Sequence, residues 1–184
     1  MGIRTDIKKE ITMDALEANV KTIRLIVPIL LVFGIPYYFL WSEQFTLSLI
    51  SQIASNTFLI LIFIISGALI HELIHGFFWS IYLKNGMKSI KFGVVWKFLT
   101  PYCHSKEPMK MKHYRFGAIM PCIILGIIPA TISLFIGNFG MFGFGVFFTI
   151  AAGGDLLMIW LLRMEEKDAL VQDHPDKIGC YILN

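Results

Sequence analysis

Long apolar stretches divide the chain into four segments, which cover about residues 25–41, 58–82, 116–136 and 142–162. Each has roughly 17–25 residues, the length of helix that crosses the hydrocarbon layer of a bilayer. Prolines inside these stretches are tolerated in membrane helices, because neighbouring groups satisfy the backbone atoms that a proline frees. The pattern predicts an all-α membrane protein built on a bundle of about four transmembrane helices.

Two of the more polar regions have patterns of their own. Before the first span, Ile7, Ile11, Leu16 and Val20 recur at helical spacing, which predicts an amphipathic N-terminal helix on the cytoplasmic face of the membrane. Residues 88–99 instead alternate between apolar and polar, as a strand does.

The sequence that follows this predicted strand completes a possible hairpin. Residues 105–108 favour a turn and residues 109–113 alternate again. We therefore expect a β-hairpin between the second and third spans, lying against the membrane. Such a hairpin either binds an extended peptide by strand addition or only caps the bundle.

Composition supports a membrane protein with one domain. The 184 residues are 56% hydrophobic and 16% charged, and the mean hydropathy is +0.68. These values are too apolar for an ordinary soluble domain. We expect residues 1–184 to form a single membrane-embedded domain, whose partners are the lipid bilayer and a membrane protein or peptide substrate, and not nucleic acid. The three cysteines do not suggest a disulfide framework.

The distribution of basic residues predicts the orientation. Five Lys or Arg residues precede the first span, eight lie between the second and third, and three follow the fourth. The other two connections, residues 42–57 and 137–141, contain none. Because cytoplasmic loops of membrane proteins are enriched in Lys and Arg, both termini and the long central loop are predicted to be cytoplasmic.

The second span carries the sequence His-Glu-Leu-Ile-His at residues 71–75. On a helix, His71 and His75 lie one turn apart on the same face, so that both imidazoles can reach one metal ion. Glu72 lies beside them, where it can take a proton from a metal-bound water. Ionisable groups are costly in lipid unless they face the protein interior and have a function there. The motif therefore predicts a zinc site with Glu72 as general base.

A catalytic zinc usually has three protein ligands and one open position, so a third ligand is needed. Asp155 is the remaining ionisable residue well inside a predicted span. Counted from the basic residues that end their spans, His71 and His75 lie roughly 20 and 14 Å deep and Asp155 roughly 12 Å deep, on the same cytoplasmic side. Asp155 is therefore the predicted third ligand.

Other assignments remain open at this point. His104, His113 and His174 all lie in predicted cytoplasmic segments and offer alternative third ligands. Asp155 can instead pair with a histidine without any metal.

The motif and the later aspartate resemble those of the site-2 protease group of intramembrane metalloproteases. More closely, the chain from the first to the fourth span resembles a family of small bacterial membrane proteins classed as zincin peptidases. The resemblance implies zinc ligation by His71, His75 and Asp155, Glu72 as general base, and a bacterial inner (cell) membrane location. Site-2 proteases carry an Asn-Pro-Asp-Gly type of sequence around the aspartate, whereas this chain has Gly-Gly-Asp-Leu at residues 153–156.

We therefore expect a zinc-dependent endopeptidase that hydrolyses membrane proteins or peptides within or near the bilayer. The alternative is a metal-handling protein or a zinc-bound, non-catalytic membrane scaffold. Haem ligation by two histidines is disfavoured, because the other three predicted spans contain no histidine.

Overall fold

The computed structural model of the protein describes residues 7–96, 100–174 and 177–184. Within this part of the chain, four helices are long and apolar enough to cross a bilayer: Val20–Gln44, Thr57–Ser80, Met111–Ile136 and Phe139–Met164. They match the four predicted segments and extend most of them by several residues. The helical part of the predicted fold is therefore confirmed, and these helices indicate a membrane protein.

Three of the four spans are interrupted helices. The first consists of α1 (Ala15–Ile29), a π-helical segment (Leu30–Gly34), α2 (Ile35–Trp41) and a 3-10 turn (Ser42–Gln44). The third consists of α5 (Met111–Pro121), a π-helical segment (Cys122–Ile127) and α6 (Ile128–Ile136). In both, the π segment directly precedes a helix with proline at its second residue, Pro36 or Pro129. Because proline cannot donate a backbone hydrogen bond, the wider turns accommodate the interruption.

The second span is the single helix α4 (Thr57–Ser80), which follows α3 (Leu47–Ser55), a short helix that we did not predict. The fourth span consists of α7 (Phe139–Ala151), α8 (Gly153–Leu161) and a 3-10 turn (Leu162–Met164). The break between α7 and α8 falls at Ala152, where the backbone leaves the helical region (ψ 5°). A Cβ on Gly153 would lie 2.2 Å from the Thr22 side chain of α1, so this glycine allows the first and fourth spans to approach closely.

The prediction of an N-terminal amphipathic helix is wrong for residues 7–13. They form β1 (Ile7–Met13), which pairs antiparallel with β6 (Ile178–Leu183) near the other end of the chain. Ile11 and Met13 are also two residues apart, the spacing of side chains on one face of a strand. Pairing with β6 decides between helix and strand, and Ile11 and Met13 pack against the buried core.

The fold is accordingly not all-α. An antiparallel sheet with the order β1-β6-β5-β4 includes β5 (Leu170–Asp173) and β4 (Met109–Lys110), and a separate pair is formed by β2 (Ile90–Val95) and β3 (Thr100–Ser105). A short 3-10 turn (Gly86–Ser89) connects α4 to β2.

The predicted hairpin is present as β2 and β3, but the residues predicted for its second strand were wrong. Residues 100–105 pair with β2, whereas residues 109–113 form β4 and the first turn of α5. The turn predicted at residues 105–108 therefore connects β3 to β4. Residues 97–99, between the two strands of the hairpin, lie outside the described residues.

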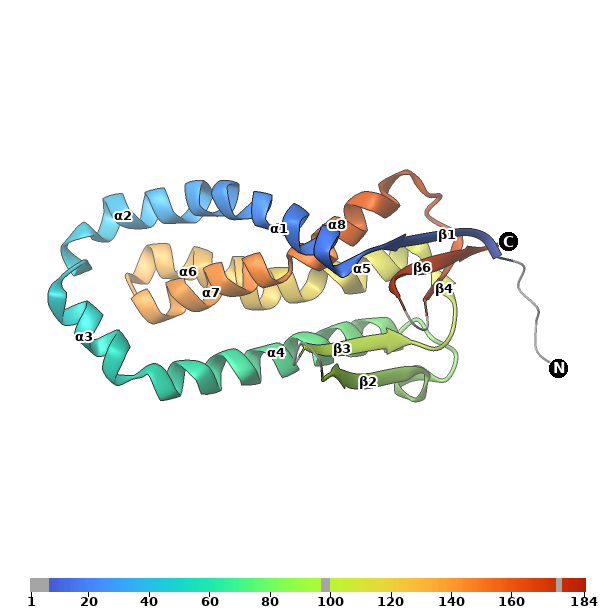
Figure 1. Cartoon of the computed structure of the whole chain (residues 1–184), viewed down its shortest axis with the longest axis horizontal. Coiled ribbons are helices and arrows are strands. Elements are labelled where there is room, and N and C mark those ends of the chain that lie inside the picture. Colours follow the sequence, from blue (N-terminus) through green and yellow to red (C-terminus); the bar gives the residue numbers. More distant parts are fainter. Residues whose placement is uncertain (1–6, 97–99, 175–176) are drawn as a thin grey trace.

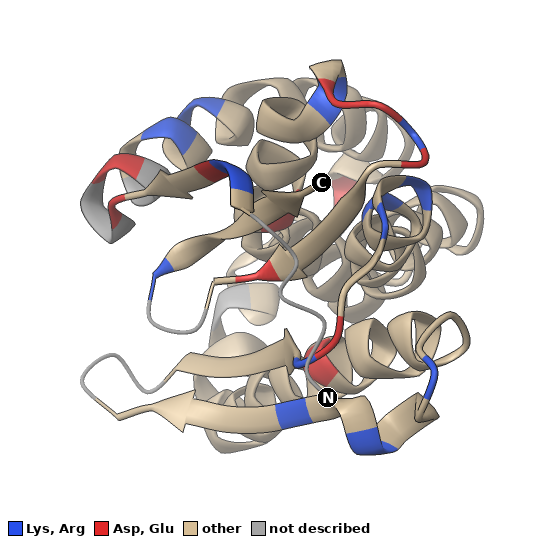
Figure 2. Ribbon diagram, turned by 90° about the vertical axis from the view of Figure 1, so that its right-hand side faces the viewer, with Lys and Arg blue, Asp and Glu red and all other residues tan. Residues whose placement is uncertain are grey.

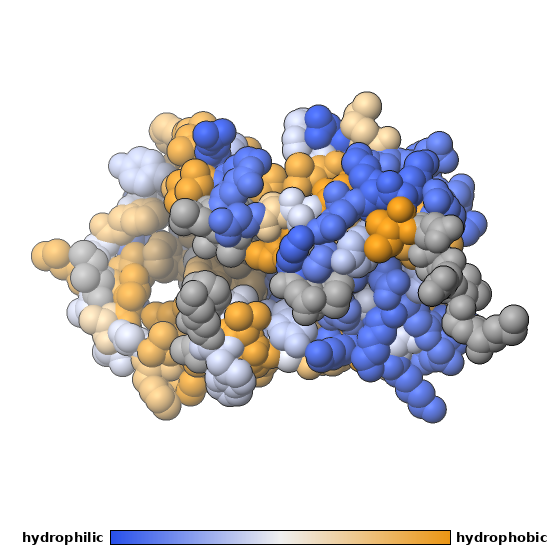
Figure 3. All heavy atoms as spheres, turned by 45° about the vertical axis from the view of Figure 1, so that its right-hand side comes forward, coloured by the Kyte–Doolittle hydropathy of each residue, from blue (hydrophilic) through white to orange (hydrophobic). Residues whose placement is uncertain are grey.

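Both sheets lie at one end of the helix bundle, where β3 contacts β5 (Figure 1). Charged residues are spread around this end (Figure 2), and hydrophilic side chains gather mainly over it (Figure 3). A buried cluster joins the sheets to the helices there; it includes Trp79, Met111, Tyr114, Leu162, Val171 and Ile182. This arrangement places the residues of the predicted zinc site close to the sheet end of the bundle.

Candidate metal centre

The second half of α4 and the first turn of α8 contribute the residues of the candidate site. His71 and His75 are buried on α4, and Asp155 lies in the first turn of α8, three residues after the helix break. A carboxylate in the first turn of a helix is favoured by the helix dipole, because free N–H groups point out of that end. The break thus brings an aspartate to α4 from a separate, short helix.

The three side chains converge on one point. His71 Nε2 lies 3.0 Å from Asp155 Oδ2, His75 Nε2 lies 3.3 Å from Asp155 Oδ1, and the two Nε2 atoms are 3.2 Å apart. Among the described residues, these three form the group of His, Cys, Asp or Glu side chains with ligand atoms close enough to hold one ion. Ligands placed tetrahedrally at zinc–ligand distances are about 3.3 Å from each other, so the spacing fits a zinc ion.

A second hydrogen bond fixes the tautomer of His75. Its Nδ1 lies 3.0 Å from the carbonyl oxygen of Gly117 in α5. A carbonyl oxygen only accepts, so Nδ1 must carry the proton and Nε2 presents its lone pair to the cluster. This is the arrangement of a metal-bound histidine oriented by an outer partner. The donor set and its orientation therefore both suit zinc.

An aromatic stack holds the His75 ring from the other side. The ring of Trp79 stacks on His75 at 5.1 Å, and Tyr114 stacks on Trp79 at the same distance. The indole Nε1 donates to the carbonyl oxygen of Tyr114 at 3.0 Å. A Cβ on Gly117 would lie 2.2 Å from the indole ring, so only glycine allows this approach. One short stretch of α5 thus positions both His75 and Trp79.

The hairpin lies directly against the motif. The Glu72 side chain is close enough to His71, His75 and Asp155 for electrostatic interaction, and the backbone of Cys103 in β3 lies near its carboxylate. A Cβ on Gly76 would lie 2.4 Å from the ring of Phe92 in β2, so this ring packs on the helix backbone beside His75. Glu72 is therefore held between its own helix and the edge of β3.

The cluster is more open on the side of Asp155. The side chain of Asp155 is 27% exposed, against 10% for His71 and 4% for His75. A Cβ on the neighbouring Gly154 would have no atom within 4 Å. An ion held by these three residues would thus be approached from the Asp155 side.

The alternative third ligands lie elsewhere. His113 stacks on the ring of Tyr82 at 3.7 Å, and His174 accepts a hydrogen bond from the backbone N–H of Lys177 in the connection between β5 and β6. His104 lies in β3, opposite Lys91. None of the three belongs to the group that could hold an ion, so the arrangement favours Asp155.

Sequence reasoning missed one buried carboxylate near the site. Asp173, at the end of β5, is only 8% exposed and accepts hydrogen bonds from the Ser105 backbone and the Tyr114 hydroxyl, both at 2.7 Å. Burial raises the pKa of Asp173, although both donors lower it. Its position in an ordinary polar segment gave no signal of this burial.

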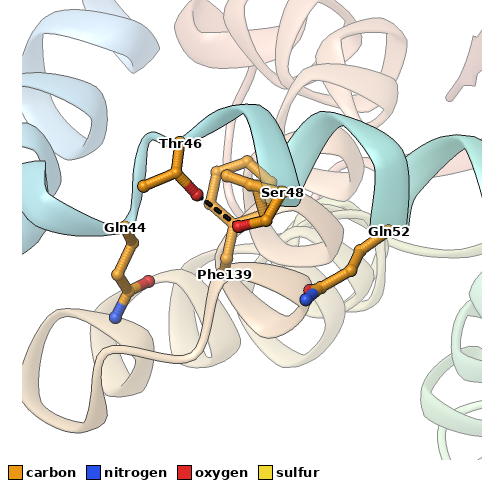
Figure 4. A pocket seen from close by; sticks show the side chains of 6 residues that line it. Gln44, Thr46, Ser48, Gln52 and Phe139 are labelled. Carbon is orange, nitrogen blue, oxygen red and sulfur yellow. Dashed lines mark hydrogen bonds between the residues drawn. The ribbon is translucent and has the colours of Figure 1, made fainter.

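A separate polar pocket lies at the opposite end of the bundle. Its volume is about 330 Å³, and it is lined by Gln44, Thr46, Ser48, Leu49, Gln52 and Phe139. In Figure 4 the hydroxyls of Thr46 and Ser48 are joined by a hydrogen bond, which measures 2.6 Å. Because its lining contains no ionisable side chain, this pocket offers neither metal ligands nor an acid or base.

Comparison with protein families agrees with this geometry. A family model described as "putative zincin peptidase" matches residues 62–170, which is more than half of the chain and includes the motif and Asp155. The chain belongs to this family. Membership in a zincin family implies zinc and suggests a metallopeptidase, in agreement with the expected family. No curated protein and no solved structure matches the chain.

Proposed function

We propose that this zincin-family protein is a zinc-dependent endopeptidase, which hydrolyses peptide bonds of membrane proteins or peptides within or near the bilayer. The observation that carries the proposal is the convergence of His71, His75 and Asp155, with Glu72 on the same helix. Family membership supports the metallopeptidase class. The membrane location of the substrate is our inference from the four long apolar helices.

Each residue has a role in the proposed reaction. Zinc bound by His71, His75 and Asp155 would polarise the scissile carbonyl and lower the pKa of a bound water toward ~7. Glu72 would act as the general base, taking the proton of the attacking water and delivering it to the leaving amine. The Gly117 carbonyl keeps the proton of His75 on Nδ1, so that Nε2 remains a ligand.

We also propose that the protein is a multi-pass protein of the bacterial inner membrane with both termini in the cytoplasm. The distribution of Lys and Arg residues supports this orientation. The position of β1, β6 and the hairpin at one end of the bundle agrees with it (Figure 1). The site then lies near the cytoplasmic surface, from which water reaches it.

The hairpin offers a way to hold an extended substrate. A transmembrane helix must unwind before cleavage, because its backbone is hydrogen-bonded to itself. The backbone N–H of Ser105 is directed away from β2, to Asp173. Cys103, two residues earlier, has the same orientation in the ladder, so the backbone groups of Phe92, which lies opposite Cys103, point to the outer edge of β2. An unwound peptide could pair along that edge, beside the helix turn that carries His75.

Metal analysis and one conservative substitution test the proposal. Purified protein should contain about one zinc per chain, the stoichiometry of a site with three ligands and one open position. Glu72→Gln should keep the zinc but remove a general base, which lowers turnover by about 10²–10⁴-fold.

Membrane-protein fragments from cells with the wild-type protein and with Glu72→Gln should then be compared by mass spectrometry. Fragments present only with the wild-type protein identify the substrate. If Glu72→Gln leaves every fragment in place while zinc is retained, a metal-handling protein or a non-catalytic scaffold replaces the peptidase.

A further inference from the structure

Asp173 joins three parts of the molecule that are distant in sequence. It ends β5, its Oδ2 accepts from the backbone N–H of Ser105 in β3, and its Oδ1 accepts from the Tyr114 hydroxyl in α5. Both oxygens are therefore used, and the residue is 8% exposed. A buried carboxylate that satisfies one donor on each side is a rigid connection, because losing either bond leaves a desolvated charge.

One side of this connection leads to a predicted zinc ligand. Tyr114 stacks on Trp79, which stacks on His75. The Tyr114 hydroxyl, which donates a hydrogen bond to Asp173, thus lies at the far end of the ring stack that supports His75. Asp173 fixes the position of that last ring.

The other side leads to the predicted base. Ser105 and Cys103 are two residues apart in β3, so their N–H groups point to the same edge of the strand. The N–H of Ser105 donates to Asp173, and the N–H of Cys103 lies near the Glu72 carboxylate. The hydrogen bond from Ser105 to Asp173 therefore fixes β3 two residues from Cys103, which lies beside Glu72.

We propose that Asp173 is a positioning residue for the site: it holds β3 in its place against α4, beside the Glu72 carboxylate. The inference rests on the proposed function, since it takes Glu72 as the base. Asp173 itself touches neither the zinc ligands nor a reacting atom in this arrangement. It acts through the hairpin and, on its other side, through Tyr114.

The thiol of Cys103 reports the position of β3 without any substrate. Burial, together with the nearby carboxylates of Glu72 and Asp173, raises the pKa of this thiol, which disfavours the reactive thiolate. The rate of alkylation by N-ethylmaleimide, measured for each cysteine by mass spectrometry, then follows the release of β3. Cys122, which is 1% exposed in the third span, is an internal control for unfolding.

Asp173→Ala should raise the alkylation rate of Cys103 about tenfold or more, while the rate at Cys122 and the zinc content stay unchanged. Asp173→Asn should remain close to wild type, because its amide oxygen accepts from Ser105 and its amide group donates to the Tyr114 oxygen. Asp168→Ala removes an exposed aspartate that pairs with Lys110 and Lys112, and it should change neither rate.

An unchanged Cys103 rate in Asp173→Ala would overturn the inference. If Asp173→Ala also exposes Cys122, the protein has unfolded and Tyr114→Phe decides instead. That variant removes one of the two donors, so a faster reaction at Cys103 alone supports the inference and a wild-type rate contradicts it. With a cleaved substrate in hand, Asp173→Ala should lower kcat and Asp173→Asn should restore it.

These outcomes are separable from those that test the peptidase itself. Thiol reactivity and zinc content are read without a substrate, so the role of Asp173 can fail while Glu72→Gln still abolishes cleavage. Conversely, cleavage that is indifferent to Glu72→Gln removes the peptidase, whatever happens at Cys103.

Discussion

The two halves of α4 belong to one long apolar segment but differ in the contacts they make. Residues 51–63, which include the first two turns of α4, are exposed at every position. From Gly67 onward one face is buried, beginning with the ring of Phe148 packed on Gly67 and ending with Trp79. All the hydrogen bonds and ring contacts that define the candidate site belong to this second half.

Hydropathy alone does not reveal this difference in contacts between the two halves of α4. The first half has only to be apolar, because lipid is the surrounding medium for a transmembrane helix. The second half carries polar side chains that must be satisfied inside the protein, so α5, α8 and the hairpin all meet it there. Substitutions should therefore have effects that depend on which half they fall in.

The largest effect is expected at the zinc ligands. His75→Ala removes one of the three proposed ligands together with the stack on Trp79, and we expect no zinc to remain after purification. Leu61→Ala, in the exposed half of the same helix, should leave about one zinc per chain. Zinc retained by His75→Ala would place the ion elsewhere.

Asp155→Asn tests the ligand that comes from α8. The amide keeps the size of the side chain but loses the negative charge, so zinc affinity should fall by more than about 100-fold, beyond the effect of outer partners. Competition with a chelator of known affinity measures the change. An unaltered affinity would return His104, His113 or His174 to consideration.

Gly117→Ala should have an intermediate effect. The added methyl displaces the indole of Trp79 and disturbs the carbonyl that holds His75, which lowers zinc affinity by about 10–100-fold. Gly143→Ala is the matched control, since a Cβ there would meet nothing within 4 Å. Equal affinities for the two variants would show that α5 does not position His75.

The smallest effect is expected in the exposed half. Ile60→Ala shortens an exposed side chain, so the free energy of unfolding should change by less than about 0.5 kcal/mol. Denaturation in detergent micelles measures this value. A loss of several kcal/mol would mean that a partner covers this half of α4.

Local patterns were enough to predict part of the molecule. The length of the apolar stretches predicted four helices, helical spacing predicted that His71 and His75 share a face, and depth counting predicted that Asp155 reaches them. Each of these follows from a distance along one helix. The structure brings the three side chains together, and zinc binding itself stays a prediction.

The parts that were wrong or missed depend on pairing between distant segments. Residues 7–13 became a strand because β6 lies beside them, and the second strand of the hairpin shifted because residues 109–110 pair with β5. Asp173 was missed for the same reason, since its two donors come from β3 and α5. No local period along the chain contains this information.

X-ray absorption at the zinc edge tests the central claim most directly, because it reports the atoms bound to the metal in the purified protein. We predict only nitrogen and oxygen ligands at about 2.0–2.2 Å, with the scattering pattern of two imidazole rings and no sulfur. Sulfur at about 2.3 Å would indicate cysteine ligation, and that result, or a protein purified without zinc, would contradict the assignment of His71, His75 and Asp155.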